Sequence, residues 1–180
     1  PVTQIAVIVS PESVWYQDLE YPATVYNSLV RSVLYQQMAH IGAPYDVLQV
    51  NDLRFPKVQN QYKLFVFLNA FYLSEYQRAW IDDLKRDDKT LAWFYAPGYV
   101  SDVEGLSVPS MEKLTGMKLG LIPGRNRPEF ETLEVAHPLL KSVESGSKMS
   151  IDAFADNTIA SEMSPAEIFP NFAVLDSEAV

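Results

Sequence analysis

The residues with the clearest chemical interest lie in the stretch TLAWFYAPGYV, from Thr90 to Val100. It has the pattern of a buried strand running into a tight turn, and several α/β enzyme families carry a nucleophile on such a turn. In this chain the turn holds Ala96, Pro97 and Gly98. The chain contains no cysteine, which excludes a thiolate nucleophile, a thiolate metal site and a disulfide. The turn therefore offers no side chain for nucleophilic catalysis.

The other candidates for catalysis are few and lie far apart in the sequence. His40 and His137 are the only imidazoles, expected near the end of a helix and in a loop, without a metal-type spacing to other ligands. Ser10 and Ser101 follow strands but lack the Gly-x-Ser-x-Gly context of a serine hydrolase. No dinucleotide-binding or Walker motif occurs. The sequence thus predicts no catalytic residue, no metal site and no cofactor.

Loop carboxylates are the weakest candidates for acid–base chemistry. They are expected at the carboxyl edge of a sheet, where two of them could act as general acid and general base. Because Asp and Glu side chains are mostly exposed in folded proteins, a solvated acidic rim is the favoured interpretation. The carboxylates concerned are Asp18, Glu20, Asp102 and Glu104.

Short apolar runs predict the strands that would position these residues. Runs rich in Ile, Val, Leu and Phe are typical of strands buried on both faces. The predicted strands cover residues 4–10, 45–50, 64–70 and 90–95, with a further β segment over 130–135 and a Ser/Gly-rich link over 144–148.

Helical patterns separate the strands. Apolar spacing predicts a long helix over residues 22–41 that ends at Gly42, and a short helix over 109–115. Ser74 and Gln77 form a capping-box pattern, so another helix is expected to begin there. The side chains of that helix expected to face inward are Ala79, Trp80, Ile81 and Leu84.

Strands that alternate with helices predict a parallel sheet covered on both faces. The expected fold class is α/β, a three-layer α/β/α, flavodoxin-like arrangement with a mostly parallel sheet. In such sheets ligands bind outside the carboxyl ends of the strands. The loops expected at that edge begin at Ser10, Asn51, Asn69 and Ala96.

Aromatic side chains gather in these loops. Flat rings with polar tips suit a protein interface or the face of a sugar, while the alternative is that the rings roof the sheet and fill the core. The Asn69 amide is a candidate too, although it could instead satisfy backbone groups of the adjoining loop. The ligand- or partner-binding candidates are Trp15, Tyr16, Asn69, Phe71, Tyr72, Tyr95 and Tyr99.

The charge balance narrows the range of partners. The chain has 14 Lys and Arg against 23 Asp and Glu, a formal net charge of -9 that repels nucleic acid and anionic lipid. No apolar run is long enough for a transmembrane helix, and no targeting segment is recognised. We expect neither nucleic acid nor a membrane as a partner; the compartment stays open, with the cytoplasm favoured.

One long stretch resembles a known family. The run LFVFLNAFYLSEYQRAWIDDLKRDDKTLAWFYAPGYV, with the preceding HIGAPYDVLQVNDL, resembles the glutamine-amidotransferase-like domain of glycoside hydrolases related to the family 42 β-galactosidases. This domain is often called the trimerisation domain. The resemblance extends over roughly residues 4–120. It implies an amidotransferase-like fold, with the hydrolytic carboxylates in a separate TIM barrel that this chain does not contain.

The resemblance also gives the Ala96 turn a meaning. Class I amidotransferases carry Gly-x-Cys-x-Gly on the turn after a strand, and matching its last glycine to Gly98 puts Ala96 at the nucleophile position and Phe94 at the first glycine. A methyl group cannot form a thioester. The resemblance therefore implies an elbow that has lost its nucleophile.

Together these observations predict a non-catalytic accessory domain that associates subunits or docks on a catalytic TIM barrel of the same protein. We expect one domain over residues 1–180, a fragment of a larger protein, because the chain starts at Pro1 and ends in a strand-like segment. A small-ligand or carbohydrate-binding module that uses the aromatic edge is the alternative. A hydrolase that uses the loop carboxylates ranks last.

Overall fold

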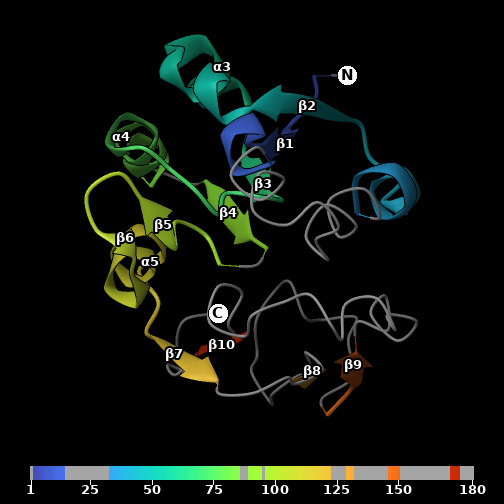
Figure 1. Cartoon of the computed structure of the whole chain (residues 1–180). Coiled ribbons are helices and arrows are strands. Elements are labelled where there is room, and N and C mark those ends of the chain that lie inside the picture. The colour runs from blue at the N-terminus through green and yellow to red at the C-terminus, as the bar shows by residue number, and fades with distance from the viewer. Residues whose placement is uncertain are drawn as a thin grey trace. The chain divides into compact units, whose positions relative to one another are not determined.

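The computed structural model describes residues 2–14, 33–85, 89–94, 96–122, 129–131, 146–150 and 171–174. Contacts between residues divide the chain into two compact units, Pro1–Leu121 together with Phe172–Val180, and Ile122–Asn171. The first unit contains a parallel sheet and its helices (Figure 1). The second contains an antiparallel pair of strands, β8 (Glu129–Glu131) and β9 (Lys148–Ser150).

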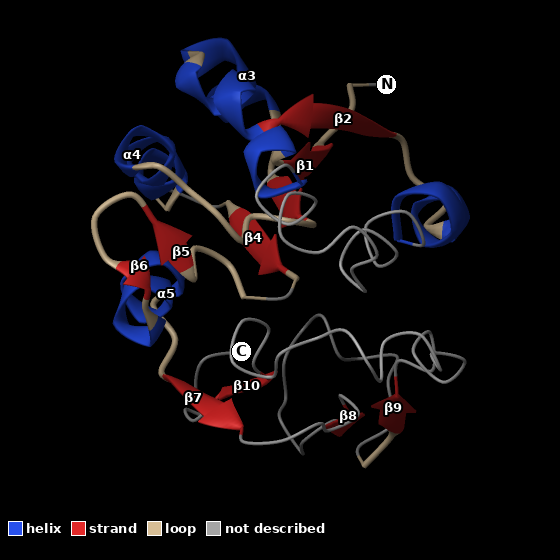
Figure 2. Cartoon of the chain, viewed as in Figure 1, coloured by secondary structure: helices blue, strands red, loops and turns tan. Residues whose placement is uncertain are grey.

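A four-stranded sheet forms the centre of the first unit (Figure 2). Its strand pairs are all parallel. The strand order is β2-β1-β3-β4, so the direction of chain progression reverses between β1 and β3. In open α/β sheets this switch point is where ligands bind. The strands are β1 (Ile5–Val9), β2 (Tyr45–Gln49), β3 (Leu64–Phe67) and β4 (Thr90–Trp93).

Both faces of the sheet are buried, because alternate side chains of each central strand point to opposite faces. On one face Ile8 and Phe67 belong to the larger core cluster, which includes apolar residues of the helices that follow β2 and β3. On the other face Val7 and Val66 pack with Met38. Continuous apolar runs thus become strands with a core on each side.

Helical segments cover each face. One face carries η3 and α3, which follow β2, together with α4 after β3. The opposite face carries η1 and η2, whose Leu34 and Met38 pack against the second cluster. The predicted three-layer α/β/α fold is therefore confirmed. The segments are η1 (Val33–Gln37), η2 (Met38–His40), η3 (Val50–Arg54), α3 (Pro56–Gln61) and α4 (Glu75–Leu84).

The predicted capping box begins α4. Ser74 Oγ accepts a hydrogen bond from the Gln77 amide at 3.4 Å, and Gln77 Oε1 accepts one from the Ser74 amide at 2.9 Å. Ile81 and Leu84 are fully buried, as predicted. The predicted inward position of Ala79 is wrong, since this residue is exposed, and Trp80 is only half-buried at the rim of the core. The buried face of α4 is rotated toward Gln77, which the capping box draws inward.

Short elements follow the sheet. A hairpin of β5 (Val100–Ser101) and β6 (Gly105–Leu106) leads into α5 (Val108–Thr115). Ser107 caps α5 by accepting a hydrogen bond from the Ser110 amide at 3.1 Å, and Gly116 ends it with a left-handed φ of 76°. β7 (Leu119–Ile122) then pairs with β10 (Asn171–Val174).

The predicted elements differ from these bounds mainly at their ends. The third and fourth strands end two to three residues earlier than predicted, at Phe67 and Trp93. Of the predicted helix over 22–41, the part from Val33 onward is helical, and residues 22–32 lie outside the described part. Gly42 follows with a left-handed φ of 69°. Most of the predicted β segment over 130–135 also lies outside it.

Candidate functional site

The turn after β4 has the backbone geometry of a sharp reversal. Ala96 has a φ of 47°, the one positive φ at a non-glycine residue in the described part of the chain, and Gly98 follows with a φ of 67°. A left-handed backbone is unfavourable for a residue with a Cβ and persists where the surroundings hold it in place. At Ala96, the position matched to the nucleophile, the chain thus keeps a strained turn without a reactive side chain.

Of the backbone amides that follow Ala96 in this turn, the first is absent and the next two donate hydrogen bonds within the protein. In enzymes with a nucleophile on such an elbow, the amide of the next residue helps to bind the oxyanion. Here the next residue is Pro97, which has no N–H. The Gly98 amide donates to Ala70 O at 2.6 Å, and the Tyr99 amide donates to Ala96 O at 3.2 Å. The turn therefore lacks the oxyanion donor as well as the nucleophile, and Pro97 was the sequence signal for it.

Arg78 on α4 ties the turn to its surroundings. Its guanidinium donates to Gly98 O at 2.6 Å, to Ser110 O at 3.2 Å and to Leu73 O at 3.4 Å. Burial lowers the pKa of Arg78, against the opposing effect of nearby carboxylates, of which Glu75 acts most strongly. One side chain thus joins α4, the Ala96 turn and the start of α5.

Asn69 joins the loops at the switch point. Its side chain is buried and makes two hydrogen bonds to the backbone of Ser10: the Ser10 amide donates to Asn69 Oδ1 at 2.6 Å, and Asn69 Nδ2 donates to Ser10 O at 2.9 Å. Ser13 Oγ continues the connection, accepting from the Tyr72 amide at 2.9 Å and donating to Tyr72 O at 3.1 Å. Asn69 therefore serves the backbone, which was one of its two predicted roles.

A second chain of polar contacts starts at Glu12. Asn51 Nδ2 donates to Glu12 Oε1 at 2.8 Å, and Gln77 Nε2 donates to Asn51 Oδ1 at 3.0 Å. Glu12 Oε2 is buried and has no hydrogen-bond partner among the described residues. These contacts connect the segments that follow β1 and β2 to the first turn of α4.

The loop carboxylates that the structure describes have local partners. The Tyr72 hydroxyl donates to Asp102, and this hydrogen bond together with burial raises the pKa of Tyr72 to about 12. Glu104 Oε2 accepts from Ser107 Oγ at 2.9 Å, and Ser101 Oγ accepts from the Glu104 amide at 2.9 Å. The other two candidates, Asp18 and Glu20, lie outside the described residues.

The predicted aromatic edge is only partly at the surface. Phe71 is 0% exposed and Tyr99 6%, and their rings lie 5.9 Å apart between centroids, so both pack in the interior. Burial also raises the pKa of Tyr99. Tyr72 is half-buried. Phe71 and Tyr99 therefore match the core alternative, and the candidates Trp15, Tyr16 and Tyr95 lie outside the described residues.

The imidazoles give no metal centre in the described part of the chain. His40 is exposed at the end of η2, and His137 lies outside the described residues. No group of three or more His, Cys, Asp or Glu side chains that could hold a metal ion occurs among the described residues. Of the described helices, none is long and apolar enough to cross a membrane.

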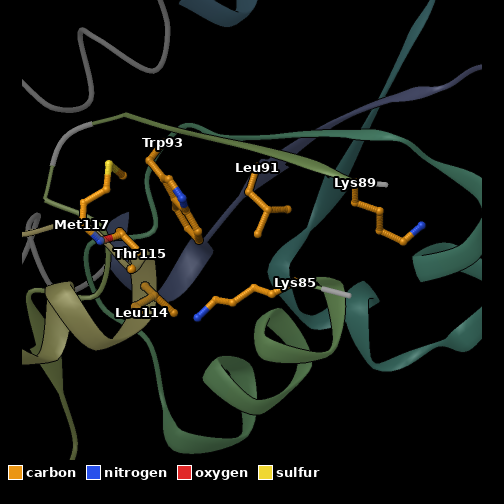
Figure 3. Close-up of a pocket in the computed structure, with 8 residues that line it drawn as sticks. Lys85, Lys89, Leu91, Trp93, Leu114, Thr115 and Met117 are labelled. Carbon is orange, nitrogen blue, oxygen red and sulfur yellow. The ribbon is translucent and has the colours of Figure 1, made fainter. Parts of the chain in front are cut away.

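A cavity of about 410 Å³ lies beside β4. Figure 3 shows Leu91 and Trp93 of β4 on one side of it and the end of α5 on the other, with Lys85 extending toward Leu114. Trp93 is stacked on Phe67, with 4.3 Å between the ring centroids. The sequence did not indicate this cavity, because its described walls come from two stretches, residues 85–93 and 114–117, that are separated along the chain.

Comparisons with known proteins find similarity in structure and none in sequence families. No protein-family model and no curated protein matches the chain. A β-galactosidase from Bifidobacterium adolescentis matches with a TM-score of 0.50 and 17% identity, over 66% of this chain and 56% of that chain. A β-galactosidase from the psychrophilic Marinomonas ef1 matches with a TM-score of 0.52 and 14% identity, over 71% of this chain and 20% of that chain.

A third match has the same character. A catalytic mutant of Gan42B, a GH42 β-galactosidase from G. stearothermophilus, gives a TM-score of 0.50 and 18% identity, over 71% of this chain and 19% of that chain. This chain thus spans about a fifth of the length of the second and third structures. It shares its fold with one part of these β-galactosidases.

Proposed function

We propose that this chain is a non-catalytic domain of a glycoside-hydrolase-related protein and that it associates with further copies of itself. The observation that carries the proposal is the turn at Ala96, which keeps a left-handed backbone but has neither a nucleophile nor, at Pro97, the amide that binds an oxyanion. Restoring catalysis would require both parts, so the turn serves as architecture.

The comparisons support the context of the proposal. The matched structures are β-galactosidases, and most of the length of two of them lies outside the region that this chain matches. A domain without catalytic groups beside a separate hydrolytic domain contributes through contacts, either between subunits or with that domain. The net charge of this chain, -9, is compatible with contacts to protein rather than to nucleic acid.

Two assays on the purified chain test the proposal. Sedimentation at increasing concentration is expected to reveal a species larger than one chain. Ammonia release from glutamine is expected to stay at the level of the buffer control. Ammonia release that persists after repurification would refute the non-catalytic role, and a single-chain species at every concentration would refute association.

Ala96→Cys provides a sharper test of the missing oxyanion donor. This variant restores the thiol at the elbow but leaves Pro97 without an N–H, so it is expected to remain without glutaminase activity. Ala96→Ser is the matched control for the change in size and polarity. Glutaminase activity in the Cys variant alone would show that the thiol was the one missing part, and the argument from Pro97 would fail.

A further inference from the structure

β4 is an edge strand of the described sheet, and half of its backbone groups face away from β3. The Thr90 amide donates to Lys63 O at 2.8 Å and the Phe94 amide to Phe67 O at 3.0 Å, so alternate residues from Thr90 onward bond β3. In a parallel ladder the residues between them direct N–H and C=O to the opposite side. Leu91 and Trp93 therefore present their backbone groups at the outer edge, where they can pair with an added strand.

The cavity of about 410 Å³ lies along this same edge. Its apolar lining includes Leu91, Trp93, Leu114 and Met117, of which Leu91 and Trp93 are packed against the core from outside and stay half-buried. In Figure 3 these side chains surround the opening between β4 and the end of α5. A strand added to β4 would bring alternate side chains over this lining, so backbone pairing and apolar contact would occur together.

The charged side chains that line the cavity favour an acidic partner. Among the described residues, the lining includes Lys85 and Lys89 and no carboxylate, although the chain as a whole carries a net charge of -9. Lys89 donates to Tyr62 O at 3.1 Å and points away from Trp93, whereas Lys85 reaches toward the opening. Lys85 Nζ is bonded to Asp82 at 2.5 Å and donates to Lys113 O at 3.4 Å, but an exposed ion pair contributes at most about 1 kcal/mol and can exchange for another carboxylate.

We propose that the outer edge of β4, with the cavity beside it, binds an extended segment of a second copy of this chain. The segment places an apolar side chain against Trp93 and a carboxylate near Lys85. An acidic chain supplies such carboxylates to a cationic edge, which favours a head-to-tail contact between copies over a contact of two β4 edges, because the latter would bring like charges together. This inference rests on the proposed self-association and names the surface that carries it.

Amide hydrogen exchange measured by NMR on the chain, at concentrations below and above self-association, tests the proposal. The amides of Leu91 and Trp93 are expected to gain at least about tenfold protection on association, because they become hydrogen-bonded. The Ala92 amide faces β3 and serves as an internal reference that is protected in both states. Sedimentation of the same samples establishes whether copies associate at all.

Variants separate this edge from the rest of the surface. Lys85→Glu and Leu91→Asp are expected to weaken association at least several-fold and to remove the added protection. Val47→Asp is the matched control on β2, the opposite edge of the sheet, where Val47 is 47% exposed. Val47→Asp is expected to leave both the association and the added amide protection unchanged. Because Lys85 is exposed, its variant keeps the fold even if Leu91→Asp does not.

Three results would overturn the inference while leaving the proposed association intact. In the first, the copies associate but the Leu91 and Trp93 amides exchange rapidly at all concentrations. In the second, these amides are protected at all concentrations, which would mean that another part of the same chain covers the edge. In the third, the Val47 variant loses association while the Lys85 variant keeps it. A chain that stays single at every concentration overturns the proposed function itself.

Discussion

Single residues hold the turn at Ala96 in place. Gly98 is left-handed, donates to Ala70 O and lies against both Arg78 and Leu114. Arg78 in turn satisfies three backbone carbonyls at once. These contacts fix the path of the chain from β4 to β5, so the turn has a structural role whether or not it ever carried a nucleophile.

Gly98→Ala is expected to destabilise the fold by about 2 to 4 kcal/mol, because left-handed strain adds to overpacking. A Cβ at this position would lie 2.7 Å from Leu114 Cδ2 and 3.0 Å from the Arg78 guanidinium. Gly116→Ala is the control, with a similar φ of 76° but nothing within 4 Å, and is expected to cost about 1 kcal/mol. If urea unfolding shows that both variants lose the same free energy of unfolding, the close approach at Gly98 is contradicted.

Arg78→Leu is expected to destabilise the fold by about 3 kcal/mol, because it leaves three carbonyl groups without their charged donor. The control is Arg54→Leu, since Arg54 is exposed and contacts the Phe55 ring at 4.5 Å, a contact worth about 0.5 to 1 kcal/mol. Unfolding midpoints of the two variants measure the difference. An Arg78 variant no less stable than the Arg54 variant would remove the guanidinium from its bridging role.

Tyr72 predicts a dependence of stability on alkaline pH. The hydrogen bond to Asp102 raises the pKa of Tyr72 to about 12 from 10. A folded-state pKa above the unfolded value means that this stabilisation is fully present below pH 10 and is lost as the pH rises through about 12. In Asp102→Asn the pKa of Tyr72, followed by NMR of the ring, is expected to fall toward 10.

Glu104→Gln is the control for this titration, because Glu104 bonds Ser107 instead of Tyr72. It is expected to leave the pKa of Tyr72 near 12. If both variants shift the pKa equally, the general negative charge of the hairpin is the cause and the hydrogen bond to Asp102 is not.

At the scale of elements, apolar patterns in the sequence predicted where strands lie better than where they end. Leu68 and Ala70 are buried like the residues of β3, and the Leu68 amide still donates to Ile8 O at 3.1 Å, although the strand ends at Phe67. The apolar run reports burial, which continues past the last paired residue. The predicted strand therefore extended to Ala70.

Helices were predicted only where a local sequence pattern specifies them. The capping box placed the start of α4 correctly, because its two hydrogen bonds are local. η3 and α3, between β2 and β3, were not predicted, since their short segments of polar residues are ordered by tertiary contacts of Val50 and Leu53 with the core. The hydrogen bonds from Arg78 to Ser110 and from Gln77 to Asn51 could not be predicted, because these partners lie far apart in sequence.

Trp80→Ala tests the observed phase of α4. Because Trp80 is half-buried at the rim of the core, its loss is expected to cost about 1 to 3 kcal/mol, below the 3 to 5 typical of a large buried aromatic side chain. Tyr76→Ala is the control, since Tyr76 is 78% exposed and its loss should stay within about 0.5 kcal/mol. Urea unfolding that gives both variants the same stability would show that α4 is rotated.

At the scale of the whole molecule, the fold was predictable from the sequence, while the function stays a proposal. Alternating strands and helices predicted the α/β/α fold, and the absence of cysteine with Ala96 at the elbow argued against amidotransferase chemistry. The aromatic edge was harder to predict, because a ring that roofs a core and a ring that binds a partner follow the same strand ends. Phe71 and Tyr99 turned out to be interior.

The outer edge of β4, which pairs with no further strand in the described part of the chain, is the association surface proposed here, and sequence patterns do not reveal it. It combines the outward backbone groups of Leu91 and Trp93 with a cavity whose cations contrast with the acidic chain. Self-association through protein contacts can therefore be tested without any substrate.

Sedimentation equilibrium of the purified chain over a wide concentration range is the most direct test. If copies of the chain associate, the average mass rises with concentration above the 20.3 kDa of one chain. Lys85→Glu is then expected to lower this average mass at a given concentration, while Val47→Asp is not. A mass that stays at 20.3 kDa throughout the range would contradict the proposed function.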